Sequence, residues 1–309
     1  MSSGHALGDP PPRARRSALP VLALSLLGIS FAAPLVRLSA NSGLVVAVWR
    51  LAISLLFVGV ALVTTGGWRA WRTLSRGDLS IAAGAGAMLA LHFWSWNTSL
   101  AFTTVAASVV LVNLQPAFVA ALSALWLRET PTRGELSGIA LAVAGAIVVG
   151  ATDAASAAGS GAFGGRALLG DLLALVGAAT AAVYYVAGRR LRQRLDLWPY
   201  VALVYGVCFA VLLAIAVARG DALGPQPRRE WLIFTALAAG PMMLGHTGMN
   251  WALKHVPAYV VNLTVLGEPI GATVLAAALP GIREVPGVHT LAGGALILAG
   301  ALVTLRARR

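Results

Sequence analysis

Charged residues and cysteine are both scarce in this sequence. Only 11% of its 309 residues are charged, 58% are hydrophobic, and Cys208 is the only cysteine. A soluble protein of this length needs far more charge to cover its surface, so the composition excludes a soluble globular fold. A lone cysteine also excludes an intrachain disulfide and any metal site built from cysteines.

The sequence patterns of common enzymes are missing as well. There is no Walker loop, no His-Glu-x-x-His helix and no Gly-x-Ser-x-Gly elbow, and the glycine-rich stretch 159–165 lacks a phosphate-binding lysine. The sequence therefore predicts a protein that is not an enzyme and that needs no cofactor or metal. An intramembrane lipid-modifying enzyme would require clustered carboxylates or histidines, and only isolated ones occur.

Long apolar segments are what the chain does contain. A bilayer core of roughly 30 Å needs roughly 20 helical residues, and the apolar segments here have about that length. We therefore expect an all-α polytopic membrane protein with ten transmembrane helices: 19–38, 44–64, 79–97, 104–127, 135–151, 168–188, 200–218, 231–253, 257–279 and 288–305.

The net charge of +12 comes from arginines near the ends of these segments, not from a long basic arm, which argues against nucleic acid as a partner. Most of them fall in cytoplasmic segments if both termini are cytoplasmic. The predicted location is the inner membrane of a bacterium. Residues 1–17 are expected to form a disordered cytoplasmic tail before an uncleaved first helix.

The two halves of the chain repeat each other. Asn97 lies 18 residues before Gln115-Pro116, and Asn250 lies 18 residues before Glu268-Pro269. Five helices per half would insert the second copy upside down, an architecture that recurs in secondary transporters. We expect one repeat at 18–151, an external linker at 152–167 and a second repeat at 168–309.

Several short segments carry a resemblance to a known family: 28–37 in the first helix, Trp49-Arg50, Leu114-Gln115-Pro116 with Leu127-Arg128-Glu129, Gly267-Glu268-Pro269 and 293–300. With these the chain, from about residue 20 to residue 305, resembles the EamA-type transporters of the drug/metabolite transporter superfamily. The resemblance implies ten helices and export of amino acids or other small metabolites. It also implies a central cavity formed by helices 1, 3, 4, 6, 8 and 9.

Glu268 is the foremost candidate for a substrate-binding residue, because a charge deep in a bilayer costs about 3 kcal/mol or more. Pro269 follows it and leaves a backbone carbonyl one turn earlier without its donor. The carboxyl could bind a substrate amine or exchange a proton near neutral pH. It could instead be structural, bonded to an arginine or to the freed backbone.

The other candidates are polar or aromatic groups within the predicted helices. Gln115 is the repeat partner of Glu268, and Arg50 could attract a carboxylate or phosphate, snorkel to the interface or pair with Glu268. The rest could line the cavity or hold helices together: Asn113, Asn262, Asn97, Asn250, Trp96, His92 and Tyr184, with His246, Tyr185 and Tyr205 as further possibilities.

The function that fits best is a secondary transporter working by alternating access, with proton coupling through Glu268 as an option. The alternatives are a non-transporting membrane subunit or sensor and, less favoured, the lipid-modifying enzyme. The expected partners are a small-molecule substrate and the lipid bilayer. Glycines in the fifth and tenth helices (Gly138, Gly145, Gly293 and Gly300) could also provide a homodimer contact.

Overall fold

The computed structural model describes residues 12–127, 131–157, 166–285 and 287–307, and in these ranges all regular structure is helical. Eight segments are long and apolar enough to cross a membrane: Ala18–Leu38, Gly43–Thr64, Arg76–Ser99, Val105–Leu127, Ala167–Arg192, Leu197–Arg219, Arg228–Ala252 and Ala258–Ala278. They follow the predicted order. Two further helices, α7 (Arg133–Ala157) and α14 (Val288–Ala307), occupy the places of the fifth and tenth.

Four of the eight segments are interrupted. The first consists of α1 (Pro12–Ser30) and α2 (Ala32–Leu38), and the fourth of α5 (Val105–Val112), α6 (Gln115–Leu122) and a π-helical turn (Ser123–Leu127). The seventh, which corresponds to the eighth predicted helix, consists of α10 (Arg228–Leu237), the π-helical segment η4 (Ala238–Thr247) and α11 (Gly248–Ala252). The eighth, which corresponds to the ninth predicted helix, consists of α12 (Ala258–Val265) and α13 (Glu268–Ala278).

The uninterrupted segments are α3 (Gly43–Thr64), α4 (Arg76–Ser99), α8 (Ala167–Arg192) and α9 (Leu197–Arg219), and a 3-10 turn, η1 (Gly67–Thr73), precedes α4. Local sequence explains several of the starts. Ser42, Ser75 and Thr104 each stand just before a helix and accept a hydrogen bond from a backbone N–H of its first turn. Such N-caps satisfy donors that the helix itself leaves free.

Two expectations about connecting segments change. Residues 12–17 belong to α1 rather than to a disordered tail, since the helix begins at Pro12, whose fixed φ suits a first turn. Residues 152–157, expected in the linker, extend α7 to Ala157, because their alanines favour helix. The remainder of the tail and linker (1–11 and 158–165), and the Arg128-Glu129 pair, lie outside the described residues.

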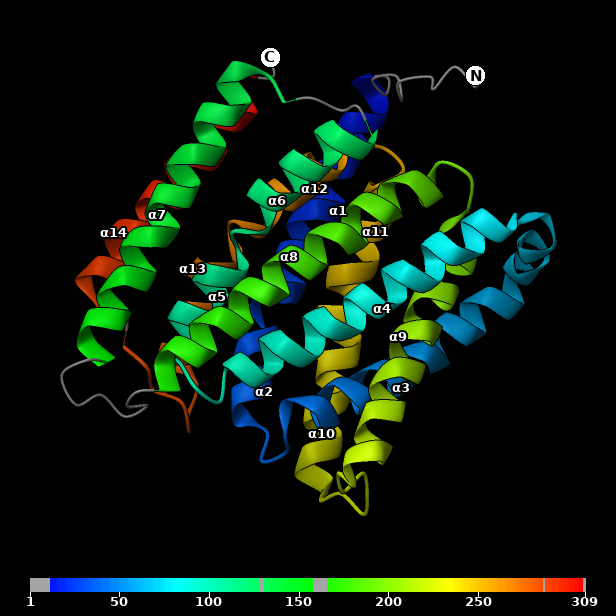
Figure 1. The fold of residues 1–309 in the computed structure, drawn as a ribbon, viewed down its shortest axis with the longest axis horizontal. Coiled ribbons are helices and arrows are strands. Elements are labelled where there is room, and N and C mark those ends of the chain that lie inside the picture. Colours follow the sequence, from blue (N-terminus) through cyan, green and yellow to red (C-terminus); the bar gives the residue numbers. More distant parts are fainter. Residues whose placement is uncertain (1–11, 128–130, 158–165, 286, 308–309) are drawn as a thin grey trace.

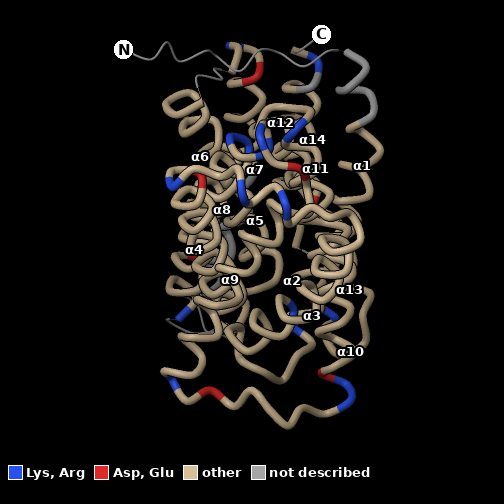
Figure 2. Tube along the Cα trace, turned by 90° about the vertical axis from the view of Figure 1, so that its right-hand side faces the viewer, with Lys and Arg blue, Asp and Glu red and all other residues tan. Residues whose placement is uncertain are grey.

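The helices run side by side, and α1 begins at the same end of the molecule at which α14 ends (Figure 1). We refer to this as the terminal end and to the other as the opposite end. From the terminal end α1 runs toward the opposite end, whereas α8 runs the other way (Figure 1). The middle of the molecule carries few charged residues, as expected for the part that lies in hydrocarbon (Figure 2).

Helices α7 and α14 pack on each other at one edge of the molecule (Figure 1). Their contact depends on glycine: a Cβ added at Gly138 would lie 2.5 Å from the carbonyl oxygen of Gly300, and one added at Gly145 would lie 2.6 Å from that of Gly293. The glycine faces therefore contact each other within one chain. These glycines are therefore not free to form a homodimer contact, and the homodimer stays a prediction that they do not support.

Candidate functional site

Breaks in two helices place Gln115 and Glu268 in equivalent positions. Each is the first residue of the second half of a broken helix, and each is followed by a proline, Pro116 or Pro269. Proline has no N–H, so it cannot donate to the carbonyl four residues earlier, which belongs to Val112 or Val265. Both breaks thus leave polar backbone beside a polar side chain in the interior of the bundle.

A cavity lies at these breaks. Its free volume is about 30 Å³, enough for a water molecule or two but not for a metabolite. It is lined from both repeats, by Ile29, Ala32, His92, Trp96, Val112, Gln115, Tyr185, His246, Met249, Val265 and Glu268. These residues come from helices 1, 3, 4, 6, 8 and 9, the set that the family resemblance implies.

Among the described residues, Glu268 is the only carboxyl that lines this cavity, and it is 6% exposed. Asn113 Nδ2 donates to its Oε2 at 3.5 Å, a long hydrogen bond. The carboxyl also lies in the first turn of α13, where the helix dipole favours negative charge. Arg50 makes no ion pair with this carboxyl. A purely structural role for Glu268 would therefore depend on its hydrogen bonds to neighbouring groups, and the one from Asn113 is long.

The amides around Glu268 connect the two broken helices. Gln115 Nε2 donates to Asn262 Oδ1, which joins α6 to α12. Asn113 and Asn262 also donate to the backbone carbonyls of Val109 and Ala258, at 2.7 and 2.8 Å. Of these three amides only Gln115 lines the cavity. The other two lie directly behind it and fix the positions of Glu268 and Gln115.

Aromatic side chains form the facing wall. The rings of His92 and Trp96 are stacked with centroids 6.0 Å apart, and His92 Nδ1 lies 2.9 Å from the carbonyl oxygen of Gly177. Trp96 Nε1 is buried and has no acceptor among the described residues, so it is available to a solute. Tyr185 Oη lies 3.5 Å from His246 Nδ1 and donates to Met249 Sδ at 3.2 Å.

Three predicted site residues lie away from the cavity. Asn97 Nδ2 donates to the carbonyl of Gly43 at 3.1 Å and ties α4 to α3. Asn250 Nδ2 donates to Tyr184 Oη at 2.5 Å and to Tyr205 Oη at 3.2 Å. These contacts make Asn97, Asn250 and Tyr184 packing residues in this conformation. Asn97 and Asn250 occupy equivalent positions in the two repeats, so they indicate the repeat, but neither lines the cavity.

Arg50, the tenth candidate, also lies outside the cavity lining, but for a different reason. It is fully buried in α3, so it does not snorkel to an interface. The structure instead adds apolar cavity residues that sequence reasoning missed: Ile29, Ala32, Val112 and Val265. Val112 and Val265 were detectable, because each precedes one of the two prolines by four residues.

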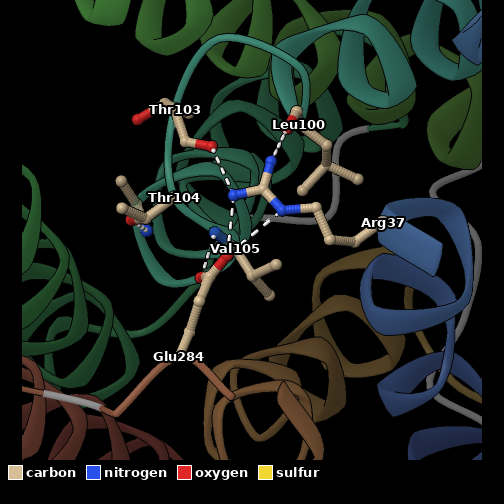
Figure 3. A network of polar contacts seen from close by, with 7 residues as sticks. Arg37, Leu100, Thr103, Thr104, Val105 and Glu284 are labelled. Carbon is tan, nitrogen blue, oxygen red and sulfur yellow. Dashed lines mark hydrogen bonds and ion pairs between the residues drawn. The ribbon is translucent and has the colours of Figure 1, made fainter. Parts of the chain in front are cut away.

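At the opposite end of the molecule a group of contacts, which we call the Arg37 latch, joins the two repeats; Figure 3 shows it from close by. Arg37 Nη2 lies 2.6 Å from Glu284 Oε1, Arg37 Nη1 donates to the carbonyl of Leu100, and the backbone N–H of Val105 donates to Glu284 Oε2 at 3.0 Å. The latch joins the end of α2 and the α4–α5 turn, both in the first repeat, to the segment after α13 in the second. A movement that parts the two repeats at this end would break these contacts.

The side chains that line the cavity can bind a polar solute through hydrogen bonds and charge. It offers a carboxyl, an amide, two imidazoles and a free indole N–H. Across the described part of the chain, no group of three or more His, Cys, Asp or Glu residues could hold a metal ion.

Comparisons with known proteins agree with this arrangement. The profile of the EamA-like transporter family matches residues 17–151 and again residues 168–306. The chain is similar to the Pseudopaline exporter CntI of Pseudomonas aeruginosa strains UCBPP-PA14 and PAO1, at 29% identity over 238 residues, which cover 76% of this chain and 78% of the relative.

A crystal structure of another protein has the same fold, with a TM-score of 0.73 and 22% sequence identity over 95% of this chain and 98% of the other. The family profile covers nearly all of the sequence, in two copies that correspond to the two halves described above. The chain therefore belongs to the EamA-like transporter family: it is a multi-pass membrane transporter and not an enzyme.

Proposed function

We propose that this transporter exports small metabolites, amino acids among them, from a bacterial cell by alternating access. The substrate binds in the central cavity, between two inverted repeats at 18–151 and 168–309. In this proposal α7 and α14 also cross the inner membrane, which makes ten spans. The terminal end faces the cytoplasm, in keeping with its excess of arginine.

One observation supports the proposal most directly: a small cavity with a buried carboxyl, lined from both repeats. A cavity of this size must widen to admit a solute, and breaks in the helices beside it allow such a movement. The similarity to a metabolite exporter supports the direction of transport. An oppositely oriented pair of repeats can exchange conformations and so open to each side in turn.

Glu268 has two possible roles within this mechanism. It can bind the ammonium group of a substrate, or it can take up a proton on one side of the membrane and release it on the other. Both roles need an ionisable oxygen at this position. A glutamine keeps the size of the side chain and removes both.

The experiment is solute counterflow into proteoliposomes loaded with a mixture of the twenty L-amino acids, with radiolabelled amino acids outside. We expect flux in the wild type and a loss of about tenfold or more in Glu268→Gln, since a central charge contact is removed. Asp221→Asn, a carboxyl in the loop after α9, is the matched control and should leave flux unchanged.

A pH gradient imposed on the same vesicles separates the two roles. Faster wild-type flux under the gradient, absent in Glu268→Gln, indicates proton exchange at this carboxyl. Equal flux with and without the gradient indicates amine binding alone. Wild-type and variant flux that agree in rate and in pH response would remove Glu268 from the mechanism, and no wild-type flux of any solute would refute the transport of amino acids.

A further inference from the structure

Arg50 is a buried charge without a hydrogen-bond acceptor. Its side chain is fully buried in α3, and Nε, Nη1 and Nη2 have no acceptor among the described residues. A guanidinium stays protonated at neutral pH, so a full positive charge lies in the core. Within the described ranges, its guanidinium has one specific contact, with the ring of Phe93, whose centroid is 4.3 Å from Arg50 Cζ.

Other buried arginines of the same chain are bonded in the ordinary way. Arg192 Nε donates to the carbonyl of Asn250 at 2.9 Å, and Arg189 Nη1 donates to that of Leu253 at 2.8 Å. Both join the end of α8 to α11, which is a structural role. A buried charge is expected to be bonded, and one that is not is costly. Arg50 does not fit the structural pattern, so a different role has to explain it.

The path of contacts from Arg50 to the cavity runs through two aromatic rings, those of Phe93 and His246. The ring of Phe93, which it contacts, lies 5.2 Å from that of His246, and His246 lines the cavity. Arg50 is also near enough to Glu268 for their charges to interact. A widening of the cavity that displaces both rings would bring the guanidinium into contact with the contents of the cavity.

We propose that Arg50 is the anion-binding group of the transport site and selects solutes that carry a carboxylate. The guanidinium bonds the carboxylate of the solute, while Glu268 receives its ammonium group. This inference rests on the transport function proposed above. The missing acceptors of Arg50 are then supplied by the substrate.

The charges of the site favour a carboxylate within a zwitterion over a phosphate. With Glu268 ionised, the charges of Arg50 and Glu268 sum to zero, so a zwitterion such as an α-amino acid keeps the interior neutral. A doubly charged phosphate would add negative charge beside Glu268, and an uncompensated charge in the bilayer interior is costly. Arginine can also donate two parallel hydrogen bonds to a carboxylate, which gives the contact direction as well as strength.

The test compares amino acids with their amides in thermal-stability measurements on the purified full chain. The probes are the twenty L-amino acids and, for each that stabilises the protein, its C-terminal amide, which keeps the ammonium group and the side chain. We expect at least one free acid to raise the melting temperature and its amide to fail, because binding to the folded form stabilises it. Arg50→Met should lose the response, with apparent affinity reduced about tenfold or more.

The stability of the ligand-free variant separates binding from structure. If Arg50 is kept for the substrate, Arg50→Met should melt at the same temperature as the wild type or higher, because an unpaired charge has been removed. If Arg50 is structural, the variant should melt lower. Arg50→Lys keeps the charge without the paired donors and should show a weakened response, and the exposed Arg69→Met is the control that should respond like the wild type.

Four results would overturn the proposal: no free acid stabilises the wild type, acid and amide stabilise it equally, Arg50→Met keeps its response, or that variant melts below the wild type. Counterflow distinguishes this failure from that of transport itself. If Arg50→Met still exchanges solutes at the wild-type rate, the transport function stands and only the role of Arg50 is wrong. If the wild type moves no solute, the transport function has failed first.

Discussion

The two ends of the molecule are closed by different kinds of contact. At the opposite end, the Arg37 latch joins the repeats through a carboxylate that receives an ion pair and a backbone N–H, and the two side chains are 19% and 28% exposed. At the terminal end, the contacts between repeats include an Arg194–Asp78 pair at 3.3 Å, with Arg194 70% exposed, and a hydrogen bond from Trp71 Nε1 to the carbonyl of Pro199.

A second group of bonds strengthens the opposite end. Glu230, at the start of α10 and only 3% exposed, accepts hydrogen bonds from the hydroxyl of Ser39 at 2.5 Å, the backbone N–H of Ala40 at 3.2 Å and Asn41 Nδ2 at 3.1 Å. Exposed ion pairs contribute little, about 0–1 kcal/mol, whereas bonds to buried charged groups contribute more. Among the described contacts, the terminal end has one long hydrogen bond of this kind between the repeats, from Tyr259 Oη to the buried Glu135 Oε1 at 3.4 Å, so the opposite end has more and shorter bonds to buried or half-buried carboxylates.

This difference indicates which end opens more readily from the present conformation. If the terminal end is cytoplasmic, the end with more of these bonds is the external one. A transporter closed outside and loosely held inside is ready to open toward the cytoplasm, where an exporter takes up its substrate. The predictions below weaken one end at a time.

The largest effect is expected from breaking the Arg37 latch. Glu284→Gln removes the charge that holds Arg37, and the equilibrium should shift toward opening at that end. A cysteine introduced at Ala32, which lines the cavity, reports the opening through its reaction with a membrane-impermeant maleimide. We expect labelling from that side to accelerate about tenfold, which corresponds to a shift of about 1.4 kcal/mol.

The chain suits this measurement because its own cysteine, Cys208, is buried, so the parent protein should react little. Arg194→Met is the matched control: it removes an ion pair at the terminal end and should leave labelling from the opposite end unchanged. If Glu284→Gln and Arg194→Met accelerate labelling equally, the contrast between the two ends is wrong.

An intermediate effect is expected from Glu230→Gln. The amide keeps one acceptor oxygen but brings an NH₂ group against donors, so at least one of the three bonds around residue 230 is lost. A buried donor left without its acceptor costs about 1–3 kcal/mol. The melting temperature of the purified protein should fall by several degrees, and Asp78→Asn, at the terminal end, should lower it less. The reverse order would contradict the comparison.

Sequence alone predicted the helix order well, because apolar length is the signal that a bilayer imposes. It also drew attention to Glu268 and Gln115, two polar residues beside prolines inside apolar segments, which line the cavity; their part in substrate binding stays a prediction. It did not foresee the tie between Arg37 and Glu284. These residues are far apart in the chain, and only the packing of the two repeats brings them together.

The fate of Arg50 shows a different limit. In the sequence, an arginine two turns into a helix could reach the interface, pair with Glu268 or bind a ligand. The sequence alone does not distinguish these three interpretations. Burial and the absence of acceptors among the described residues exclude the first two in this conformation. Asn97 and Asn250 show a second limit of the sequence. Equivalent positions in the two repeats indicate shared structure, but whether a side chain faces the cavity depends on its direction.

The smallest effect is expected from a contact on the surface of the terminal end. Lys254 Nζ donates to Asp196 Oδ1 at 2.8 Å, and this hydrogen bond and the lysine's charge lower the pKa of the Asp196 carboxyl. A lowered pKa in the folded state stabilises the protein above the unfolded value of about 3.9, and this stability is lost as the pH falls through that range.

Because the Asp196 side chain is 83% exposed, the contribution should be no more than about 0.5 kcal/mol. Lys254→Met should therefore lower the melting temperature by a degree or less at pH 7, and the difference from the wild type should vanish near pH 3. A deficit of several degrees, or one that persists in acid, would show that Lys254 stabilises the terminal end through contacts other than this exposed ion pair.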